Sequence, residues 1–414
     1  MPRVLLLMTS TTYRAEAFVT AAARTGLDLV VGTDRPQVLA FARPEAHVTL
    51  DFDKLDAAVA AIASFHADHP LDAVLATDDD GVVLAARVAD RLSLAGNSTE
   101  GATAARDKRL FRRVLADAGL PGPRRWTFSA GDDARAVADG VAYPCIVKAP
   151  ALSASRAVIR ADDAAGFVSA FERVARILGR SRAPDTGRTP EILVESYLPG
   201  DEIALEGLLT EGRLRTLAIF DKPDPLVGPF FEETILVTPS RHPKDTQRAV
   251  ADAVTAAAAA LGLSHGPVHA EARVEGGAPT LLEIAPRTIG GRCSKALRFA
   301  GGVSLEEVVL RHAVGAAYEA PERERDASGV MMIPIPRAGI LEGVRGQDDA
   351  ARVPGITEIE LTHAIGADLV PLPEGSRYVG FIFARGEAPE EVVASLKKAH
   401  GFLQLDIRAA GDGA

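Results

Sequence analysis

Apolar and polar positions alternate along the first ninety residues in the rhythm of strands and amphipathic helices. Short apolar runs predict buried strands, and stretches with an apolar side chain every three or four residues predict helices. The helix over residues 54–66, for example, has Leu55, Val59, Ile62 and Phe65 on one face. The predicted elements are strand 4–8, helix 14–24, strand 28–31, helix 54–66, strand 72–76 and helix 80–92. This order predicts a layered βαβ sheet of the Rossmann type.

After residue 96 the predicted elements no longer alternate regularly between strand and helix. A helix over residues 108–118 begins after Asp107, which suits an N-cap, and ends before Gly119. The other predicted elements are strands 126–128, 143–148, 192–195, 202–209, 214–220, 269–274 and 280–284, helix 245–261, strands 330–335 and 378–385, and helix 389–400. Residues 179–190 are rich in Pro, Gly and Arg and predict an exposed loop, and the charged segment 321–328 predicts a linker. We therefore expect units over residues 1–96, 97–198, 199–320 and 329–414.

Composition narrows the class of protein. The chain has 414 residues, of which 47% are hydrophobic, enough for several packed domains. No apolar run is long enough to span a membrane, and the start lacks the cleavage site of a secretory signal, so we expect a cytoplasmic protein. The formal charge of −10 and the lack of a basic block argue against nucleic-acid binding. Cys145 and Cys293 have no second Cys or His at metal-ligand spacing, so we expect two buried thiols.

Neither common phosphate-binding signature is present. Residues 9–13, after the first predicted strand, have no G-x-G-x-x-G sequence, and the chain has no Walker A sequence. Charged residues instead lie at the ends of predicted elements and on neighbouring strands: Lys108 closes an A-R-D-K element, Lys148 ends a strand, Glu271 and Glu283 lie on successive strands, and Arg287 follows them. Together with V-E-S-Y-L-P-G-D-E over residues 194–202, this order resembles the ATP-grasp superfamily from about residue 1 to 312.

Three stretches narrow the resemblance to bacterial L-amino-acid ligases and their relatives. They are S-A-S-R-A-V-I-R (153–160), F-D-K-P-D-P-L-V-G-P-F-F-E-E (220–233), and G-P-V-H-A-E-A-R-V with L-E-I-A-P-R-T-I-G-G-R-C-S (266–274 and 282–294). D-alanine ligases usually have Asn two residues after the second acidic residue, where this chain has Ala285. The spacing of Glu283 and Arg287 is similar to that of the amino-acid-ligase and carboxylase branches.

The resemblance implies an ATP-grasp fold of mixed α/β and α+β class. Residues 1–96 would form a Rossmann-like pre-ATP-grasp domain, 97–198 linker helices and the small ATP-grasp lobe, 199–320 the large lobe, and 329–414 a C-terminal α/β lobe. The resemblance also implies ATP and Mg²⁺ as cofactors, with Mn²⁺ as a substitute, and small-molecule carboxylate and amine substrates. A homodimer is left open.

Glu271 and Glu283 are the expected metal ligands. Carboxylates on neighbouring strands can hold Mg²⁺ together with triphosphate oxygens, which is the hard-oxygen ligation that Mg²⁺ prefers. Each could instead be an exposed strand carboxylate in a surface ion pair. Ala285 departs from the common E-x-N pattern, so the third protein ligand is left open.

The resemblance assigns eight residues to ATP. Two lysines approach the α- and β-phosphates, residues 195–198 form a hinge whose backbone reads the adenine edge, and an acidic residue holds the ribose hydroxyls. Lys148 carries the strongest independent signal, because a charge at the end of the apolar strand 145–147 is costly without a partner. For Glu202, a solvated strand end is an equal alternative. The implied residues are Lys108, Lys148, Ser153, Ser155, Glu195, Tyr197, Leu198 and Glu202.

Residues 152–158 form a loop of small residues that we expect to fold over the phosphates. Successive backbone N–H groups in such a loop can bind an anion. Family loops at this place usually contain glycine, whereas this one has Ala154, Arg156 and Ala157. An ordinary hairpin turn is the alternative.

Arg287, Lys222, Gly290 and Gly291 are the expected catalytic residues. The planar guanidinium of Arg287 suits an acyl phosphate or a tetrahedral oxyanion, which is the role that the resemblance implies. The glycine pair allows close backbone approach to substrate, although a tight turn also explains it. Gly291 in place of a bulky residue predicts a roomier substrate pocket.

The Pro-rich segment 223–231 lies between Lys222 and the pair Glu232 and Glu233. Lys222 suits a clamp for a substrate carboxylate, and either glutamate suits a substrate ammonium group, but a packed surface loop explains the segment as well. His269 lies two residues before Glu271 and shares its strand face, so it either touches the site or is a core histidine with satisfied hydrogen bonds.

We therefore expect carboxylate–amine ligation, in which ATP phosphorylates a carboxylate, an amine attacks the acyl phosphate, and ADP and phosphate leave. Amino acids are the expected substrates. Two alternatives stay open. One is a carboxylase-type or purine-pathway ATP-grasp enzyme, which shares the Glu–Arg spacing. The other is a nucleotide-binding regulator without turnover, which Ala285 and the glycine-poor loop would allow.

Overall fold

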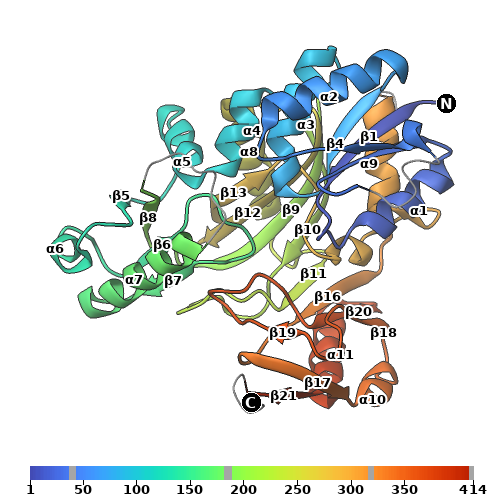
Figure 1. Ribbon diagram of the computed structural model, residues 1–414. Helices are drawn as coiled ribbons and strands as arrows, with labels where there is room; N and C mark the ends of the chain where they lie inside the picture. Colours follow the sequence, from blue (N-terminus) through green and yellow to red (C-terminus); the bar gives the residue numbers. More distant parts are fainter. Residues whose placement is uncertain (37–42, 181–188, 316–320, 410–414) are drawn as a thin grey trace.

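The computed structural model describes residues 1–36, 43–180, 189–315 and 321–409. An N-terminal domain, a small lobe and a large sheet that continues into a C-terminal lobe surround one cleft (Figure 1). The small lobe projects to the left in Figure 1, and the C-terminal lobe lies below. Among the helices within these ranges, none has the length and apolar character needed to cross a membrane. Both cysteines are buried free thiols, as the sequence predicts.

The N-terminal domain is the predicted layered sheet. Its strands are parallel in the order β3-β2-β1-β4, and Leu5 of the apolar strand β1 pairs with Val30 and Val74 on either side. The first helix ends at Gly26, whose positive φ of 69° glycine adopts without steric cost. The elements are β1 (Arg3–Met8), α1 (Ala15–Thr25), β2 (Asp28–Thr33), η1 (Pro44–Ala46), β3 (His47–Thr49), α2 (Leu55–Asp68), β4 (Ala73–Ala76), η2 (Asp79–Gly81) and α3 (Val82–Leu92).

Two capped helices lead into the small lobe. The Ser98 side chain accepts a hydrogen bond from the Gly101 N–H at the start of α4 (Thr99–Arg106), and Asp107 caps α5 (Lys108–Asp117). The lobe is an antiparallel sheet in the order β5-β8-β6-β7. Its elements are β5 (Arg125–Ser129), α6 (Ala134–Ala138), β6 (Cys145–Lys148), β7 (Val158–Ala161), α7 (Ala164–Arg180) and β8 (Glu191–Ser196).

Helix α7 was not predicted from the sequence. Phe167, Phe171 and Val174 recur at helical spacing and are buried in the core of the small lobe. The predicted loop over residues 179–190 is wrong at its start, because Gly179 and Arg180 complete α7. The rest of that loop, residues 181–188, lies outside the described residues.

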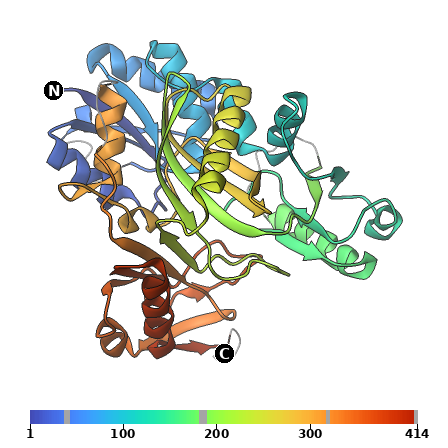
Figure 2. The same ribbon diagram turned by 180° about the vertical axis from the view of Figure 1, so that it is seen from behind.

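The large lobe is built on a sheet of eight strands in the order β13-β12-β9-β10-β11-β16-β20-β18. The alanine-rich helix α8 covers one face of this sheet (Figure 2). Helix α9 was not predicted, and it packs with α1 against the other side. The elements are β9 (Asp201–Thr210), β10 (Arg213–Asp221), β11 (Ile235–Thr238), α8 (Lys244–Leu261), β12 (Gly266–Glu275), β13 (Ala278–Ala285), η3 (Cys293–Ala296), β14 (Arg298–Phe299), β15 (Val303–Ser304) and α9 (Leu305–Val314).

The C-terminal lobe shares the large sheet. Strand β16 pairs with β11 through Ile235 and Met331, and β16 in turn pairs with β20. The predicted linker over residues 321–328 is therefore too long, since β16 begins at Ala327. The predicted domain boundaries stay a proposal. The elements are β16 (Ala327–Ile333), β17 (Gly339–Arg345), α10 (Gln347–Ala351), β18 (Ile356–Leu361), β19 (Asp368–Leu369), β20 (Gly380–Gly386), α11 (Pro389–Phe402) and β21 (Gln404–Arg408).

Candidate active site

A cleft of about 470 Å³ lies where the N-terminal domain, both lobes and the C-terminal segment 376–378 meet. Its walls come from the loops after β1 and β4, from the loop after β6, and from strands β9, β12 and β13. Every site residue predicted from the sequence lines this cleft except Lys222 and Glu232. The structure therefore brings together residues that are up to 183 positions apart, as Lys108 and Gly291 are.

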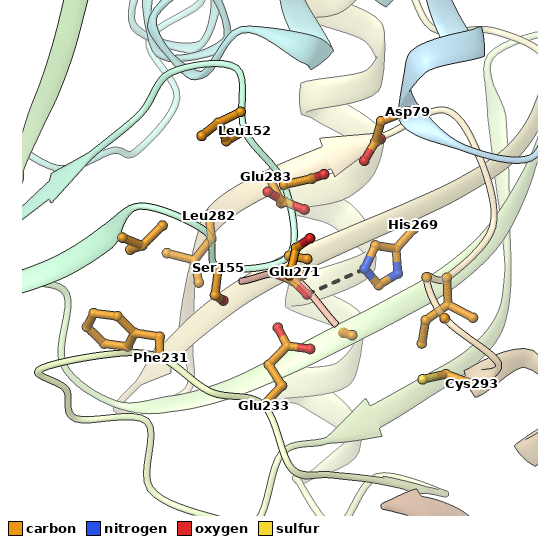
Figure 3. A pocket seen from close by; sticks show the side chains of 18 of the residues that line it. Asp79, Leu152, Ser155, Phe231, Glu233, His269, Glu271, Leu282, Glu283 and Cys293 are labelled. Atoms are coloured by element: carbon orange, nitrogen blue, oxygen red, sulfur yellow. Dashed lines mark ion pairs between the residues drawn. The ribbon is translucent and has the colours of Figure 1, made fainter. Parts of the chain in front are cut away.

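Glu271 and Glu283 lie directly opposite each other on the neighbouring strands β12 and β13. Figure 3 shows both carboxylates facing the same cavity. A register shift follows Glu271 in this pair of strands, and such a bulge can redirect a side chain at a site. The pair offers hard oxygen ligands to a divalent cation from two rigid strands.

Lys222, Glu202, Glu233 and Glu271 form a buried group that we name the carboxylate cluster. The Lys222 Nζ donates to Glu202 and Glu233, each at 2.7 Å, and to Glu271 at 2.8 Å. One oxygen from each of the three carboxylates lies within 4.8 Å of the others, close enough to share a metal ion. The Lys222 side chain is only 3% exposed, so its ammonium group is already occupied and does not reach the cleft.

Burial and mutual repulsion set the titration of the carboxylate cluster. Burial raises the pKa of Glu233 to about 7, aided by the Glu271 and Glu202 charges and opposed by Lys222. Burial also acts to raise the pKa of Glu271, but Lys222 and His269 outweigh it and hold that pKa well below its usual range. Burial acts to lower the pKa of Lys222, yet three carboxylates hold it well above the ordinary value. Arg273 beside Glu202 and the protonated His269 beside Glu271 and Glu206 add two cations and one carboxylate, so four carboxylates face three cations. The excess is at most one negative charge, which suits a cation.

His269 joins the carboxylate cluster to a residue that was not predicted, Glu206. The His269 Nδ1 forms a short hydrogen bond with Glu206, which lies opposite it on β9, and its Nε2 lies 3.5 Å from Glu271, as the dashed line in Figure 3 shows. Burial acts to lower the pKa of His269, but Glu206 and Glu271 raise it to about 9. Of the two alternatives for His269, the structure supports both, since it is buried with satisfied hydrogen bonds and also lines the cleft.

Arg112, Glu195 and Lys148 form a second buried group, which we name the phosphate-side cluster. The Glu195 carboxylate accepts from the Arg112 Nε and from the Lys148 Nζ, each at 2.6 Å. The Lys148 ammonium group at the end of β6 is buried and requires an ion-pair partner, and Glu195 is that partner. Arg112 also donates to the backbone oxygens of Leu281 and Leu282, and this fixes α5 against β13. The sequence analysis did not single out Arg112.

Two cations and one carboxylate give the phosphate-side cluster excess positive charge. Burial lowers the pKa of Lys148 to about 8, with Arg112 and Lys108 adding to that effect and Glu195 opposing it. Burial acts to raise the pKa of Glu195, but Arg112 and Lys148 outweigh it and lower that pKa to about 2. Lys148 lines the cleft, so it offers an ammonium group to an anion there.

Lys108 connects three parts of the cleft. It is the first residue of α5, directly after the Asp107 cap. Its Nζ donates to the backbone oxygen of Leu152 at 2.9 Å and lies 3.4 Å from Glu283. The predicted phosphate contact and the predicted metal ligand are therefore neighbours.

The loop over residues 152–158 has a left-handed backbone without any glycine. Ala154, Ser155 and Ala157 have φ of 55°, 54° and 55°. Side chains rarely adopt this conformation, which costs about 1 kcal/mol or more per residue, and such strain concentrates at functional sites. The Ala157 N–H donates to Pro373, and the Arg156 Nε donates to Glu374, so the C-terminal lobe anchors the loop.

The predicted adenine hinge links the small lobe to β9. The Tyr197 N–H donates to the backbone oxygen of Pro144 at 3.0 Å, and Tyr197 and Leu198 both line the cleft. Glu202, the predicted ribose ligand, has a cationic partner on each oxygen: Lys222 at 2.7 Å and Arg273 at 3.0 Å. Each oxygen of Glu202 is thus paired with a cation and retains one further lone pair for a donor in the cleft.

Arg287 is held by an aspartate that was not predicted. Its guanidinium donates to both oxygens of Asp79, at 2.8 and 3.0 Å, and to the Thr288 backbone oxygen. Burial acts to lower the pKa of Arg287, but Asp79 holds it above the ordinary value. The fork is therefore charged and fixed in orientation, as a bidentate anion contact requires.

The loop that follows Arg287 is fixed from the N-terminal domain. The buried Arg14 donates to the backbone oxygens of Thr77, Thr288 and Ile289. Gly291 has φ of 60°, and a Cβ there would approach the Phe381 ring to 3.2 Å, so a bulky residue would fill space at the cleft. Arg14, like Asp79, was missed because its partners lie far along the sequence.

The two adjacent glutamates of the Pro-rich segment differ in position. Glu233 lines the cleft and pairs with Lys222, whereas Glu232 is absent from the lining. Burial raises the pKa of Glu232. The arrangement thus favours Glu233 over Glu232 as a contact for a substrate ammonium group.

Comparison with protein families finds three matches along the chain. Residues 19–96 match the ATP-grasp N-terminal domain, residues 141–296 the ATP-grasp domain, and residues 331–408 the L-amino acid ligase C-terminal domain 2. These matches confirm the resemblance to ATP-grasp proteins and to L-amino-acid ligases.

Curated relatives are distant. An uncharacterized protein, y4rH, of Sinorhizobium fredii is 23% identical over 414 residues, which is 100% of this chain and 84% of the relative. The alanine–anticapsin ligase of Bacillus amyloliquefaciens is 28% identical over 258 residues, 58% of this chain and 53% of that protein. The chain thus spans about half the length of this ligase.

Solved structures confirm the predicted ATP-grasp fold. The L-amino acid ligase from Bacillus licheniformis superposes with a TM-score of 0.84 at 24% identity, covering 99% of both chains. The N5-carboxyaminoimidazole ribonucleotide synthetase from Thermotoga maritima reaches 0.70 at 13% identity, covering 99% of this chain and 100% of that one.

Proposed function

From the ATP-grasp domain that this chain carries between an ATP-grasp N-terminal domain and an L-amino acid ligase C-terminal domain, we propose that it is an ADP-forming carboxylate–amine ligase. It would join two amino-acid-like substrates through an acyl phosphate. The observation that carries the proposal is the pairing of opposite charge excesses across one cleft. The phosphate-side cluster and Lys108 face the carboxylates of β12 and β13, with Arg287 beside them.

The residues that line the cleft fit a nucleoside triphosphate and a divalent cation. Lys148 and Lys108 offer cations to the phosphates, and the left-handed backbone at Ser155 suits an anion nest. Glu271 and Glu283 would hold Mg²⁺, or Mn²⁺ in its place, and Lys222 keeps Glu271 ionised and in position. The bound ion would supply charge neutralisation at the phosphates.

Arg287 is placed for the acyl-transfer steps. In the first step a carboxylate oxygen bonds to the γ-phosphorus and ADP leaves. In the second step a neutral amine attacks the acyl carbon and phosphate leaves. Negative charge develops on oxygen in both steps, and a charged guanidinium fixed by Asp79 stabilises it without reorganising. Glu233, with a pKa of about 7, is suited to accept the proton that the substrate ammonium group loses to become the attacking amine.

The C-terminal match favours amino acids over the alternatives. A carboxylase-type or purine-pathway enzyme shares the fold, but a similarity of 13% identity carries no further argument. The L-amino acid ligase C-terminal domain over residues 331–408 supports peptide-bond formation. Arg287, fixed by Asp79 beside the paired carboxylates, speaks against a regulator without turnover, because nucleotide binding alone requires no contact for an acyl phosphate. The cytoplasmic location and the oligomeric state stay predictions.

One screen tests the proposal. Phosphate release would be measured with the standard amino acids, singly and in pairs, and the spent nucleotide separated by chromatography. We expect release that depends on an amine substrate and yields ADP. AMP and pyrophosphate as main products would contradict the acyl-phosphate route, and bicarbonate-dependent release would favour the carboxylase alternative.

A further inference from the structure

A second cavity of about 320 Å³ lies behind the cleft, and the proposed reaction does not use it. It is enclosed by α1, the segment 291–298, the start of α9 and the end of β20. Tyr13, Arg14 and Gly291 line both cavities, so one layer of residues separates them. The volume lies in the range of small-molecule sites.

Glu306 lines this cavity, and the charge of the buried Arg14 acts on it, but none of the ion pairs within the described residues includes it. It is 4% exposed, and no group of the described residues forms a hydrogen bond with its buried Oε1. Glu306 is the second residue of α9, and the helix N-terminus stabilises a nearby carboxylate only partly. Because a buried carboxylate oxygen without a hydrogen bond is costly, the position points to a donor from outside the chain.

The cations around the cavity are already matched. Arg14 donates to backbone oxygens, as described above. Four other basic side chains have carboxylate partners. These pairs are Arg24 with Glu307 at 3.0 Å, Arg292 with Glu360 at 3.0 Å, Lys295 with Glu358 at 3.1 Å and Arg385 with Glu324 at 2.7 Å.

Arg298 is the exception among the basic side chains that line the cavity. It is exposed, and no carboxylate of the described ranges pairs with its guanidinium. The unmatched charges are thus a buried carboxylate and an exposed guanidinium. Leu297 and Phe383 also line the cavity and add apolar surface to it.

We infer that this cavity binds an α-amino acid zwitterion, with its ammonium group at Glu306 and its carboxylate at Arg298. An ammonium ion in the cavity supplies charge and a hydrogen bond to the Glu306 carboxylate, and the planar fork of Arg298 suits a carboxylate. Apolar lining suits an aliphatic side chain. The site is separate from the ligase cleft and stands whether or not the proposed reaction is correct.

Titration calorimetry with L-leucine tests the inference, with Mg²⁺ and a non-hydrolysable ATP analogue present to occupy the cleft. We expect Glu306→Gln to weaken one binding event by about tenfold, the effect of losing one charge-assisted hydrogen bond. Glu390→Gln is the matched control, because Glu390 is also in the first turn of a helix but lies outside the cavity. Glu271→Gln reports on leucine bound in the cleft instead.

Two further ligands and the variant Arg298→Ala test the contributions of Glu306 and Arg298 separately. Isoamylamine lacks the carboxylate, so Arg298→Ala should leave its affinity unchanged while weakening that of L-leucine. 4-Methylpentanoate lacks the ammonium group and should bind weakly to every variant. Arg298 is exposed, so its removal should not impair folding.

Three results would overturn the inference. The first is L-leucine affinity that Glu306→Gln and Arg298→Ala both leave unchanged. The second is binding lost only in Glu271→Gln, which would place the amino acid in the cleft. The third is a lower melting temperature for Glu306→Gln, because an unpaired carboxylate should not stabilise the fold and a loss would reveal an internal partner.

Discussion

The two buried charge clusters of the cleft are opposite in composition. The phosphate-side cluster has Arg112 and Lys148 against Glu195. The carboxylate cluster has Lys222 against three glutamates, and with its neighbours Arg273, His269 and Glu206 it keeps an excess of at most one negative charge. Buried charges that only stabilised the fold would be expected to balance, because each unmatched charge is expensive in a low-dielectric interior. An excess of one sign in each cluster, facing one cleft, instead suits a ligand that brings both signs, such as a metal–triphosphate.

The largest expected effect comes from neutralising either of the two expected metal ligands, Glu271 in the carboxylate cluster or Glu283 opposite it. Glu271→Gln or Glu283→Gln should lower turnover by roughly a thousandfold or more, because an amide oxygen holds Mg²⁺ poorly and several kcal/mol of charge stabilisation are lost. Phosphate release at limiting Mg²⁺ measures this, with melting curves for both variants. Glu275→Gln, an exposed residue of the same strand, is the control. Near-normal rates in both variants would remove these residues from the metal site.

Arg287 lines the same cleft as the two clusters and tests whether the site does more than bind a metal–nucleotide. Arg287→Lys keeps the charge but replaces a bidentate fork with a point donor, so coupled turnover should fall by roughly ten- to a thousandfold with little change in ATP affinity. Calorimetry, melting and amine-dependent phosphate release on one preparation measure these. The exposed Arg213→Lys is the control. Parent-rate ligation by a variant that binds ATP and melts normally would exclude a catalytic role.

Removing positive charge from the phosphate-side cluster should have a smaller effect. Lys148→Met should raise the KM for ATP by roughly ten- to a hundredfold, the equivalent of one charge-assisted hydrogen bond to phosphate. Arg112 still neutralises Glu195, so folding should persist. Steady-state kinetics against ATP, with the exposed Lys54→Met as control, measures the change. An unchanged KM would mean that Lys148 serves only Glu195.

The smallest effect concerns pH. Burial lowers the pKa of Lys148 to about 8, so its ammonium form is lost as pH rises through that value. ATP affinity should fall by at most roughly tenfold from pH 7 to pH 9. Calorimetric titration across this range should show the slope in the parent and not in Lys148→Arg. The same slope in both proteins would assign it to another group.

The site residues that stand in short, characteristic sequence patterns could be predicted from the sequence. Lys148 was identifiable because a charge ends an apolar strand, and Glu271 and Glu283 because their order along the chain resembles that of ATP-grasp proteins. Arg112 was not, since on an amphipathic helix it is indistinguishable from a solvated arginine until β8 supplies Glu195. Asp79 and Arg14 were missed for the same reason: the groups that they hold at Arg287 and Thr288 lie more than 200 residues away.

The secondary structure likewise divides into elements that local sequence predicts and elements that depend on distant contacts. The N-terminal helices have one apolar face and were predicted, whereas α9 was missed because Leu305, Val308, Val309 and Leu310 bury it on several sides and remove the period. The short strand β11 was missed because its pairing partner, β16, comes ninety residues later. Periodicity reports one buried face, and it fails where tertiary contacts surround an element.

The unbroken sheet from β13 to β18 limits how such a protein can be rearranged by recombination. A breakpoint just before residue 327 would separate β11 from β16 and leave both with unsatisfied backbone groups, which invites aggregation. The C-terminal lobe also holds the phosphate loop through Pro373 and Glu374. Chimeras with another ligase should therefore tolerate exchange of the N-terminal domain, whose strands form a sheet of their own, better than exchange of the C-terminal lobe.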